Sequence, residues 1–144
     1  MGNQNARLSV TCLILQDGRI VGFFTVTPDT LHKGRVNLSD KLSDYPYEKY
    51  PAIKLARLAV DKRYQRQGIG KELLLSYFRI ANLISLKLGG RYLTVDAKST
   101  ALSFYEHFGF KPVLSKKMED IIPMYLDIHD IISIVESPGG QPFI

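Results

Sequence analysis

The 144 residues are enough for one domain with one core, and 45% hydrophobic with 23% charged residues is typical of a globular protein. No apolar run approaches the roughly 20 residues of a membrane span, and residues 1–10 lack a secretory signal pattern, so we expect a cytoplasmic protein. The single cysteine, Cys12, excludes an internal disulfide, and the net charge is +5.

The first half of the chain predicts three strands and one long helix. Residues 7–28 read as two strands joined by the hairpin turn Asp17-Gly18. Residues 29–51 are polar and contain prolines, which predicts a loop with a short helical turn. Residues 52–60 form a buried strand, and the apolar periodicity of residues 70–88 predicts a helix that ends at Gly89-Gly90.

The second half predicts a further strand over residues 91–97 and a helix over 99–108, with Ser99 as its N-cap. Residues 110–115 and 121–128 read as an antiparallel strand pair, 129–136 as a short helix and 137–144 as a loose tail. One β-α-β unit, residues 52–97, therefore lies inside an antiparallel meander. We expect residues 1–144 to form a single domain.

Residues 61–71, DKRYQRQGIGK, join the third strand to the long helix. The first N–H groups of a helix have no internal partners, and the helix dipole adds positive charge there. Gly68 and Gly70 allow the backbone to approach a ligand because they have no Cβ. Residues 54–71 hold six basic residues and one acid, so this segment carries the whole net charge. The pattern predicts a phosphate or pyrophosphate site, and a solvated basic loop is the alternative.

Two familiar phosphate-binding motifs do not fit. A P-loop requires glycine where Gln65 stands and Ser or Thr where Glu72 stands, and a dinucleotide fingerprint requires glycine at Leu73. The spacing Q-x-x-G-x-G of residues 65–70 instead resembles the coenzyme-A-binding motif of the GNAT acetyltransferase superfamily. Residues 101–110, ALSFYEHFGF, also match the A-x-x-F-Y-x-x-x-G-F element of that family, and the resemblance covers residues 8–127.

The resemblance implies an α+β fold. Its GNAT-like, mixed and mostly antiparallel sheet would have a central β-α-β unit, splayed strands, and helices on both faces. The strand at residues 52–60 would separate from the strand at 91–97, and the cofactor would enter between them. Acetyl-CoA is the implied co-substrate, and no metal is expected.

The resemblance also implies how the cofactor is held. Backbone groups of the strand at 58–60 would bind the pantetheine arm as an added strand would, and amides of 65–71 would hold the pyrophosphate. Many members have an asparagine after the next strand, but residues 96–100, DAKST, contain none, so Ser99 or Thr100 would partly replace it. The implied cofactor-binding residues are Leu58, Ala59, Val60, Arg63, Gln65, Arg66, Gln67, Gly68, Ile69, Gly70, Lys71, Ser99 and Tyr105.

Tyr105 and Asp96 are the catalytic candidates. By resemblance, the neutral phenol of Tyr105 would protonate the departing coenzyme A thiolate or donate a hydrogen bond to it. The alternative is a packed aromatic beside Phe104 and Phe108. Asp96, at a strand end, could accept the amine proton through water, and a salt bridge or a helix cap is its alternative. The three histidines are scattered without metal-ligand spacing, and they form no triad with Cys12.

The acceptor is left open by the sequence. GNAT members usually have a strand and two helices before the hairpin, and this chain is N-terminally short by that standard. We therefore expect an acceptor pocket that is shallow, built by residues 29–51, or completed by a second subunit in a homodimer.

Residues 54–70 and 103–110 resemble a GNAT branch that includes toxins of toxin–antitoxin pairs, which acetylate aminoacyl-tRNA. That branch implies an antitoxin partner. The function that we expect is an N-acetyltransferase that moves the acetyl group of acetyl-CoA to a primary amine of a small molecule or protein by direct attack. Acetylation of aminoacyl-tRNA, and acetyl-CoA binding without turnover, are the alternatives. The positive charge of residues 54–71 does not distinguish these acceptors, because coenzyme A is itself an anion and accounts for that charge without RNA.

Overall fold

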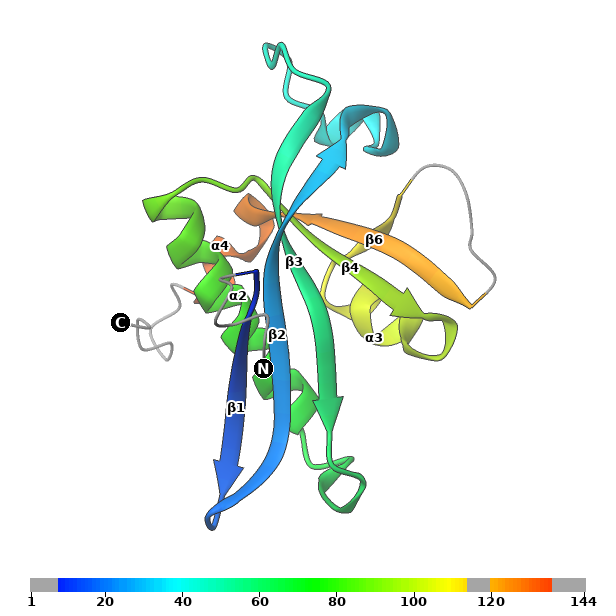
Figure 1. Cartoon of the computed structure of the whole chain (residues 1–144). Coiled ribbons are helices and arrows are strands. Elements are labelled where there is room, and N and C mark those ends of the chain that lie inside the picture. The colour runs from blue at the N-terminus through cyan, green and yellow to red at the C-terminus, as the bar shows by residue number, and fades with distance from the viewer. Residues whose placement is uncertain (1–7, 114–119, 136–144) are drawn as a thin grey trace.

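The structure, a computed structural model, describes residues 8–113 and 120–135. Its centre is one six-stranded sheet in the order β1-β2-β3-β4-β6-β5, in which only β3 and β4 are parallel (Figure 1). The strands are β1 (Val10–Gln16), β2 (Arg19–His32), β3 (Lys49–Val60), β4 (Tyr92–Lys98), β5 (Lys111–Pro112) and β6 (Ile121–Asp127). This is the predicted α+β arrangement, a mostly antiparallel sheet around one β-α-β unit. The predicted tail at 137–144 lies outside the described residues.

Three α-helices accompany the sheet in the described part of the chain: α2 (Ile69–Lys87), α3 (Leu102–His107) and α4 (Ile132–Val135). Helix α2 connects β3 to β4 and lies within one residue of its predicted bounds, because its apolar residues recur at helical spacing. The face toward the sheet buries Leu73, Leu74, Tyr77, Phe78 and Ala81. The helix ends where Gly89 and Gly90 take positive φ values of 111° and 139°, which suit glycine.

All three α-helices share one buried core on one face of the sheet. Strand residues of alternating register face this core, among them Phe24, Leu55, Leu93 and Met124. Helices were predicted on both faces of the sheet. Within the described part of the chain, the second face, which is opposite this core, carries only 3-10 turns. They are η1 (Lys33–Arg35) and η2 (Leu38–Asp40).

The second face is anchored by a run of tyrosine rings. Neighbouring rings of Tyr47, Tyr45, Tyr50, Tyr92 and Tyr125 lie 4.8–6.1 Å apart. Tyr92 donates a hydrogen bond to the Asp40 carbonyl, and Tyr125 donates one of 2.7 Å to the Asp40 carboxylate. These contacts hold the segment between β2 and β3 on the second face of the sheet.

Two local predictions need correction. Residues 29–32 and 49–51 are strand and not loop: β2 continues to His32 opposite Lys49. Pro28 and Pro51 suggested a break, but both are accommodated in this pair, opposite Ile53 and Thr30. Ser99 is not a helix N-cap, because it begins a separate 3-10 turn (η4, Ser99–Ala101) before α3, and neither turn nor helix has a side-chain cap.

Candidate active site

The two parallel strands separate halfway along their length, which confirms the predicted splay. β3 and β4 pair only from Ala52↔Tyr92 to Leu55↔Val95. Beyond this point β3 follows β2 to Gly22↔Val60, whereas β4 follows β6 to Lys98↔Ile121 (Figure 1). The register between β2 and β3 shifts at the same place and leaves Ala56 as an extra residue. A bulge bends a strand, so Ala56 explains where the fork opens.

The fork exposes strand backbone that has no strand neighbour. The Asp61 N–H donates to the Val21 carbonyl at 2.8 Å, so by alternation Ala59 directs its backbone groups toward β2. Leu58 and Val60 then direct theirs into the fork. Of the three residues predicted to hold a pantetheine arm, Leu58 and Val60 have the required orientation, and the backbone of Ala59 faces β2.

Gln65 closes the turn that follows β3. Its side-chain amide donates a 3.2 Å hydrogen bond to the Val60 carbonyl, five residues back. The same turn contains a 3-10 helix, η3 (Lys62–Tyr64), which Asp61 caps by accepting from the Arg63 N–H at 2.9 Å. Gln65 therefore has a structural contact in addition to its predicted place in the phosphate site.

Arg63 is held beside Asp61 and is not an independent charge. Its guanidinium donates to both carboxylate oxygens of Asp61, at 3.3 and 3.2 Å. These hydrogen bonds lower the pKa of Asp61 and raise the pKa of Arg63. Lys62, Arg66 and Lys71 are exposed and have no ion-pair partner among the described residues, so they carry the unpaired positive charge of the turn.

The start of α2 is shaped to receive an anion. Gly68 is the N-cap, with φ of 80° and no side-chain cap. The first hydrogen bond of the helix runs from the Glu72 N–H to the Gly68 carbonyl at 3.1 Å. The N–H groups of residues 69–71 precede it and therefore have no acceptor within the helix. A Cβ on Gly68 would meet no atom within 4 Å. The space beside Gly68 is therefore open, and the free amides of this turn with the neighbouring positive charges fit a pyrophosphate group.

Tyr105 lies on α3, next to this turn. The ring of the preceding residue, Phe104, lies 3.8 Å from where a Cβ on Gly70 would be, so α3 packs directly against the start of α2. Tyr105 is 6% exposed, with its ring 5.6 Å from that of Phe110. Burial raises its pKa to about 12, so the phenol is protonated at neutral pH. Its hydroxyl has no hydrogen-bond partner among the described residues, which leaves it available to a ligand.

Lys54 and Asp96 join the two strands at the mouth of the fork. The Lys54 ammonium donates to the Asp96 carboxylate at 2.8 Å, next to the last paired residues, Leu55 and Val95. The salt bridge that sequence analysis left as an alternative for Asp96 is therefore present. On the same face, Thr94 donates to Asp29 at 2.7 Å, across the intervening strand.

Sequence reasoning gave no site role to Lys54, Thr94 or Asp29. Lys54 and Thr94 were polar residues inside apolar strand patterns, and Asp29 lay in the predicted loop. None of these local patterns reveals a partner on another strand. Ser99, the remaining predicted contact, is exposed at the end of β4 and is placed by a 3.0 Å bond from its N–H to the Asp120 carbonyl. In residues 8–113 and 120–135 no group of three His, Cys, Asp or Glu side chains is arranged to hold a metal.

Comparison with known proteins gives a consistent result. Residues 8–112 match the family model of the acetyltransferase (GNAT) domain. The chain is 34% identical over 113 residues to a tRNA-acetylating toxin of Mycobacterium tuberculosis, covering 74% of this chain and 61% of the relative. It thus spans less than two thirds of that relative's length.

Solved structures share the fold. A bacterial toxin superposes with a TM-score of 0.85 at 25% identity, over 97% of this chain and 79% of its own. AtaT complexed with acetyl-methionyl-tRNAfMet superposes with a TM-score of 0.79 at 22% identity, over 90% and 77%. Given the fork, the turn and the matched residues 8–112, the chain belongs to the GNAT acetyltransferase family.

Proposed function

We propose that this protein transfers the acetyl group of acetyl-CoA to the amino group of an aminoacyl-tRNA. The observation that carries the acetyltransferase assignment is the fork between β3 and β4, which leads from the Lys54–Asp96 pair to the open amides at the start of α2. A long, thin ligand with a pyrophosphate at one end fits that arrangement. The acceptor class is supported by the tRNA-acetylating relative and by the AtaT complex.

The cofactor-binding residues act through position and charge. Leu58 and Val60 offer backbone groups along the fork, in the way an edge strand accepts a further strand. The amides of residues 69–71 hold the pyrophosphate, with the helix dipole favouring its charge. Arg66 and Lys71 neutralise the remaining negative charge. Acetyl-CoA supplies the acetyl group as a thioester.

Tyr105 acts as the general acid. The acceptor nitrogen bonds to the acetyl carbon, and the carbon–sulfur bond breaks. The Tyr105 hydroxyl donates its proton to the departing sulfur and regains one from solvent. The nitrogen loses its extra proton to water, and Asp96 lies at the mouth of the fork, paired with Lys54. Because burial raises the pKa of the Tyr105 phenol to about 12, the phenol is still protonated when the carbon–sulfur bond breaks.

The experiment is calorimetric titration with acetyl-CoA, followed by thiol release in the presence of charged tRNA or small amines. We expect binding, and release with charged tRNA. Tyr105→Phe should retain the affinity but lose about 100-fold or more in kcat. Tyr47→Phe, a substitution at an exposed ring, is the matched control. Binding without release on any acceptor would support the alternative of a non-catalytic acetyl-CoA-binding protein.

The location and partners follow from this proposal. Acetyl-CoA and charged tRNA are cytoplasmic, so we place the enzyme there. No helix in the described part of the chain is long and apolar enough to cross a membrane. An antitoxin is a proposed protein partner, because the AtaT toxin, which shares the fold, has been solved bound to the C-terminus of the antitoxin AtaR. A second copy of the chain, which would complete the acceptor side, is the other proposed partner.

A further inference from the structure

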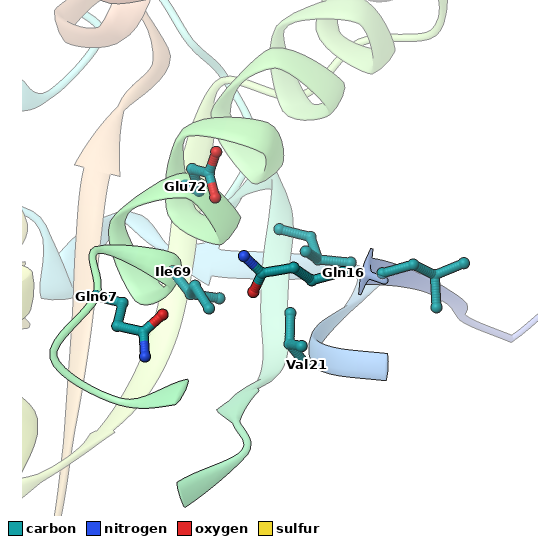
Figure 2. Close-up of a pocket in the computed structure, with 7 residues that line it drawn as sticks. Gln16, Val21, Gln67, Ile69 and Glu72 are labelled. Carbon is teal, nitrogen blue, oxygen red and sulfur yellow. The ribbon is translucent and has the colours of Figure 1, made fainter. Parts of the chain in front are cut away.

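The acceptor has to reach the fork by a route that the cofactor leaves free. The pocket drawn in Figure 2 lies where the β1–β2 hairpin meets the first turn of α2. It has a volume of about 540 Å³, and its lining includes Gln67 and Ile69 of the turn before α2, so it adjoins the cofactor side of the site. Helices α2 and α3 cover the first face of the sheet. The second face is therefore the side from which the acceptor approaches.

Four side chains gather on the second face at the base of the fork: Asp29, Lys54, Thr94 and Asp96. Lys54 lies between two residues of β3 that face the core, and Thr94 and Asp96 alternate in the same way with core residues of β4. Asp29 belongs to β2 and accepts a 2.7 Å hydrogen bond from the Thr94 hydroxyl. The group therefore joins three strands at the place where β3 and β4 stop pairing.

Asp29 is the acid of this group whose charge has no counter-ion. Lys54, on the strand between Asp29 and Thr94, donates to Asp96 instead, at 2.8 Å. Asp29 is half-buried, and within residues 8–113 and 120–135 its one hydrogen bond comes from the neutral hydroxyl of Thr94, which is 6% exposed. Partial burial of an unpaired negative charge is unfavourable unless a positive partner arrives. The buried threonine fixes the carboxylate, and its second oxygen is available to a ligand.

Tyr77 relates Asp29 to the proposed general acid. Its hydroxyl donates a 2.6 Å hydrogen bond to the carbonyl of Ile53, in the paired part of β3. Burial is the main cause that holds the pKa of Tyr77 well above its usual value, and electrostatic repulsion from Asp29 and Tyr105 adds to it. Both side chains therefore lie near this hydroxyl, Tyr105 in the core and Asp29 on the second face. An amine held by Asp29 would meet an acetyl group beside Tyr105 from the opposite side.

We propose that Asp29 accepts a hydrogen bond from the acceptor amine and stabilises the positive charge that develops on its nitrogen. The proposal rests on the proposed function, because it concerns the acceptor of the same acetyl transfer. The lone pair of the neutral amine becomes the new bond to the acetyl carbon, so the nitrogen becomes positive. The electron pair of the carbon–sulfur bond leaves with the sulfur, which Tyr105 protonates. The nitrogen then loses a proton to water, and Asp29 remains a carboxylate throughout. A fixed charge aimed at a charge that forms during the reaction lowers the barrier.

The first test removes the charge and retains the hydrogen bond. Asp29→Asn keeps an oxygen that can accept from Thr94. Its single-turnover rate of acetyl transfer to charged tRNA should fall about 100-fold. Its Kd for acetyl-CoA, measured by calorimetry, and its midpoint of urea unfolding should be unchanged. The matched control is Asp44→Asn, which removes the same charge at an exposed position and should change none of the three.

The second test concerns Thr94, which acts through Asp29 and is a positioning residue. Thr94→Val removes the hydroxyl and should lower the single-turnover rate about 10-fold, the effect of one hydrogen bond to a charged group. Thr94→Ser keeps the hydroxyl and should restore the rate. In an Asp29→Ala background Thr94→Val should have no further effect, because no carboxylate is left to orient. A merely structural role of Thr94 would lower the rate equally in both backgrounds.

The outcomes separate the two proposals. If the wild type transfers acetyl and Asp29→Asn does so equally fast, the role of Asp29 is wrong and the acetyltransferase stands. If Asp29→Asn loses acetyl-CoA affinity by the same factor as rate, the role is also wrong, because the change then acts on the cofactor and not on the amine. If the wild type transfers acetyl to no amine, the proposed function fails, and the role of Asp29 fails with it.

Discussion

The Lys54 ammonium lies 2.8 Å from the Asp96 carboxylate and connects β3 to β4 at the point where the strands begin to separate. Both side chains are partly exposed, at 29% and 47%, so the pair contributes about 1 kcal/mol or less to the free energy of unfolding. Its position suggests that it sets the width of the fork.

The first prediction concerns the role of Asp96. If the pair only sets the geometry, Asp96→Asn and Lys54→Met lower kcat/KM for acetyl transfer by similar factors, below about 10-fold, and retain the pH profile. If Asp96 is the base, only Asp96→Asn removes the acidic limb of that profile, with a loss of about 100-fold or more. We expect the first outcome, because one carboxylate oxygen is already bound by Lys54.

The second prediction concerns the proton on Tyr105. Burial raises the pKa of this phenol to about 12, so it is protonated at every pH up to well above 10. The ratio of kcat between wild type and Tyr105→Phe should therefore be constant from pH 7 to about 10. Steady-state rates over this range measure it. A ratio that falls toward one near pH 8 would show that the phenol loses its proton there, and a ratio near one at every pH would show that the proton comes from another group.

The third prediction separates stability from ligand binding at Gly70. A Cβ there would meet only Phe104 and Val60, at 3.8 and 4.0 Å, and would improve helix propensity. Gly70→Ala should raise the free energy of unfolding by up to about 1 kcal/mol. It should nevertheless weaken acetyl-CoA binding, because the methyl group occupies space beside the phosphate-binding amides. Urea unfolding and calorimetry on the same sample measure both.

Gly22 provides the contrast for this experiment. A Cβ there would lie 2.9 Å from a Leu73 methyl group and 3.0 Å from the Ala59 carbonyl, where α2 packs on the sheet. Gly22→Ala should therefore lower the free energy of unfolding by about 1–3 kcal/mol. If Gly70→Ala is destabilising to the same extent, our account of Gly70 is incorrect.

The fourth prediction concerns acid stability. Burial acts to raise the pKa of Asp40, but hydrogen bonds from Tyr125 and Lys111, with the Lys111 charge, lower it below its usual value. A lowered pKa in the folded state contributes stability above the unfolded value, about pH 3.9, which is lost as pH falls through the folded value. Asp40→Asn should thus be destabilising at pH 5–8, with a deficit that shrinks below about pH 4.

Urea unfolding between pH 3 and pH 8 measures this deficit. Asp44→Asn, at an exposed aspartate of the same connection, is the control and should behave like the wild type. A deficit for Asp40→Asn that is independent of pH down to pH 3 would show that its charge does not matter.

Local sequence patterns determined much of this protein. The apolar spacing of α2, its terminal glycines and the turn with Gly68 and Gly70 act within one stretch of chain, so they could be predicted with their bounds. Tyr105 was found from a second local motif, residues 101–110, because that motif resembles an element of the GNAT family. These features depend on backbone preferences and side-chain periodicity, which neighbouring residues set by themselves.

Contacts between distant segments could be decided only by the tertiary structure. The strand extensions at 29–32 and 49–51 exist because each segment supplies the other's hydrogen-bonding partners, which overrides the signal of Pro28 and Pro51. The Lys54–Asp96 pair spans 42 positions, and the pocket combines the β1–β2 hairpin with α2. Such contacts depend on strand register and on the bulge at Ala56, and no single stretch of the chain contains both partners.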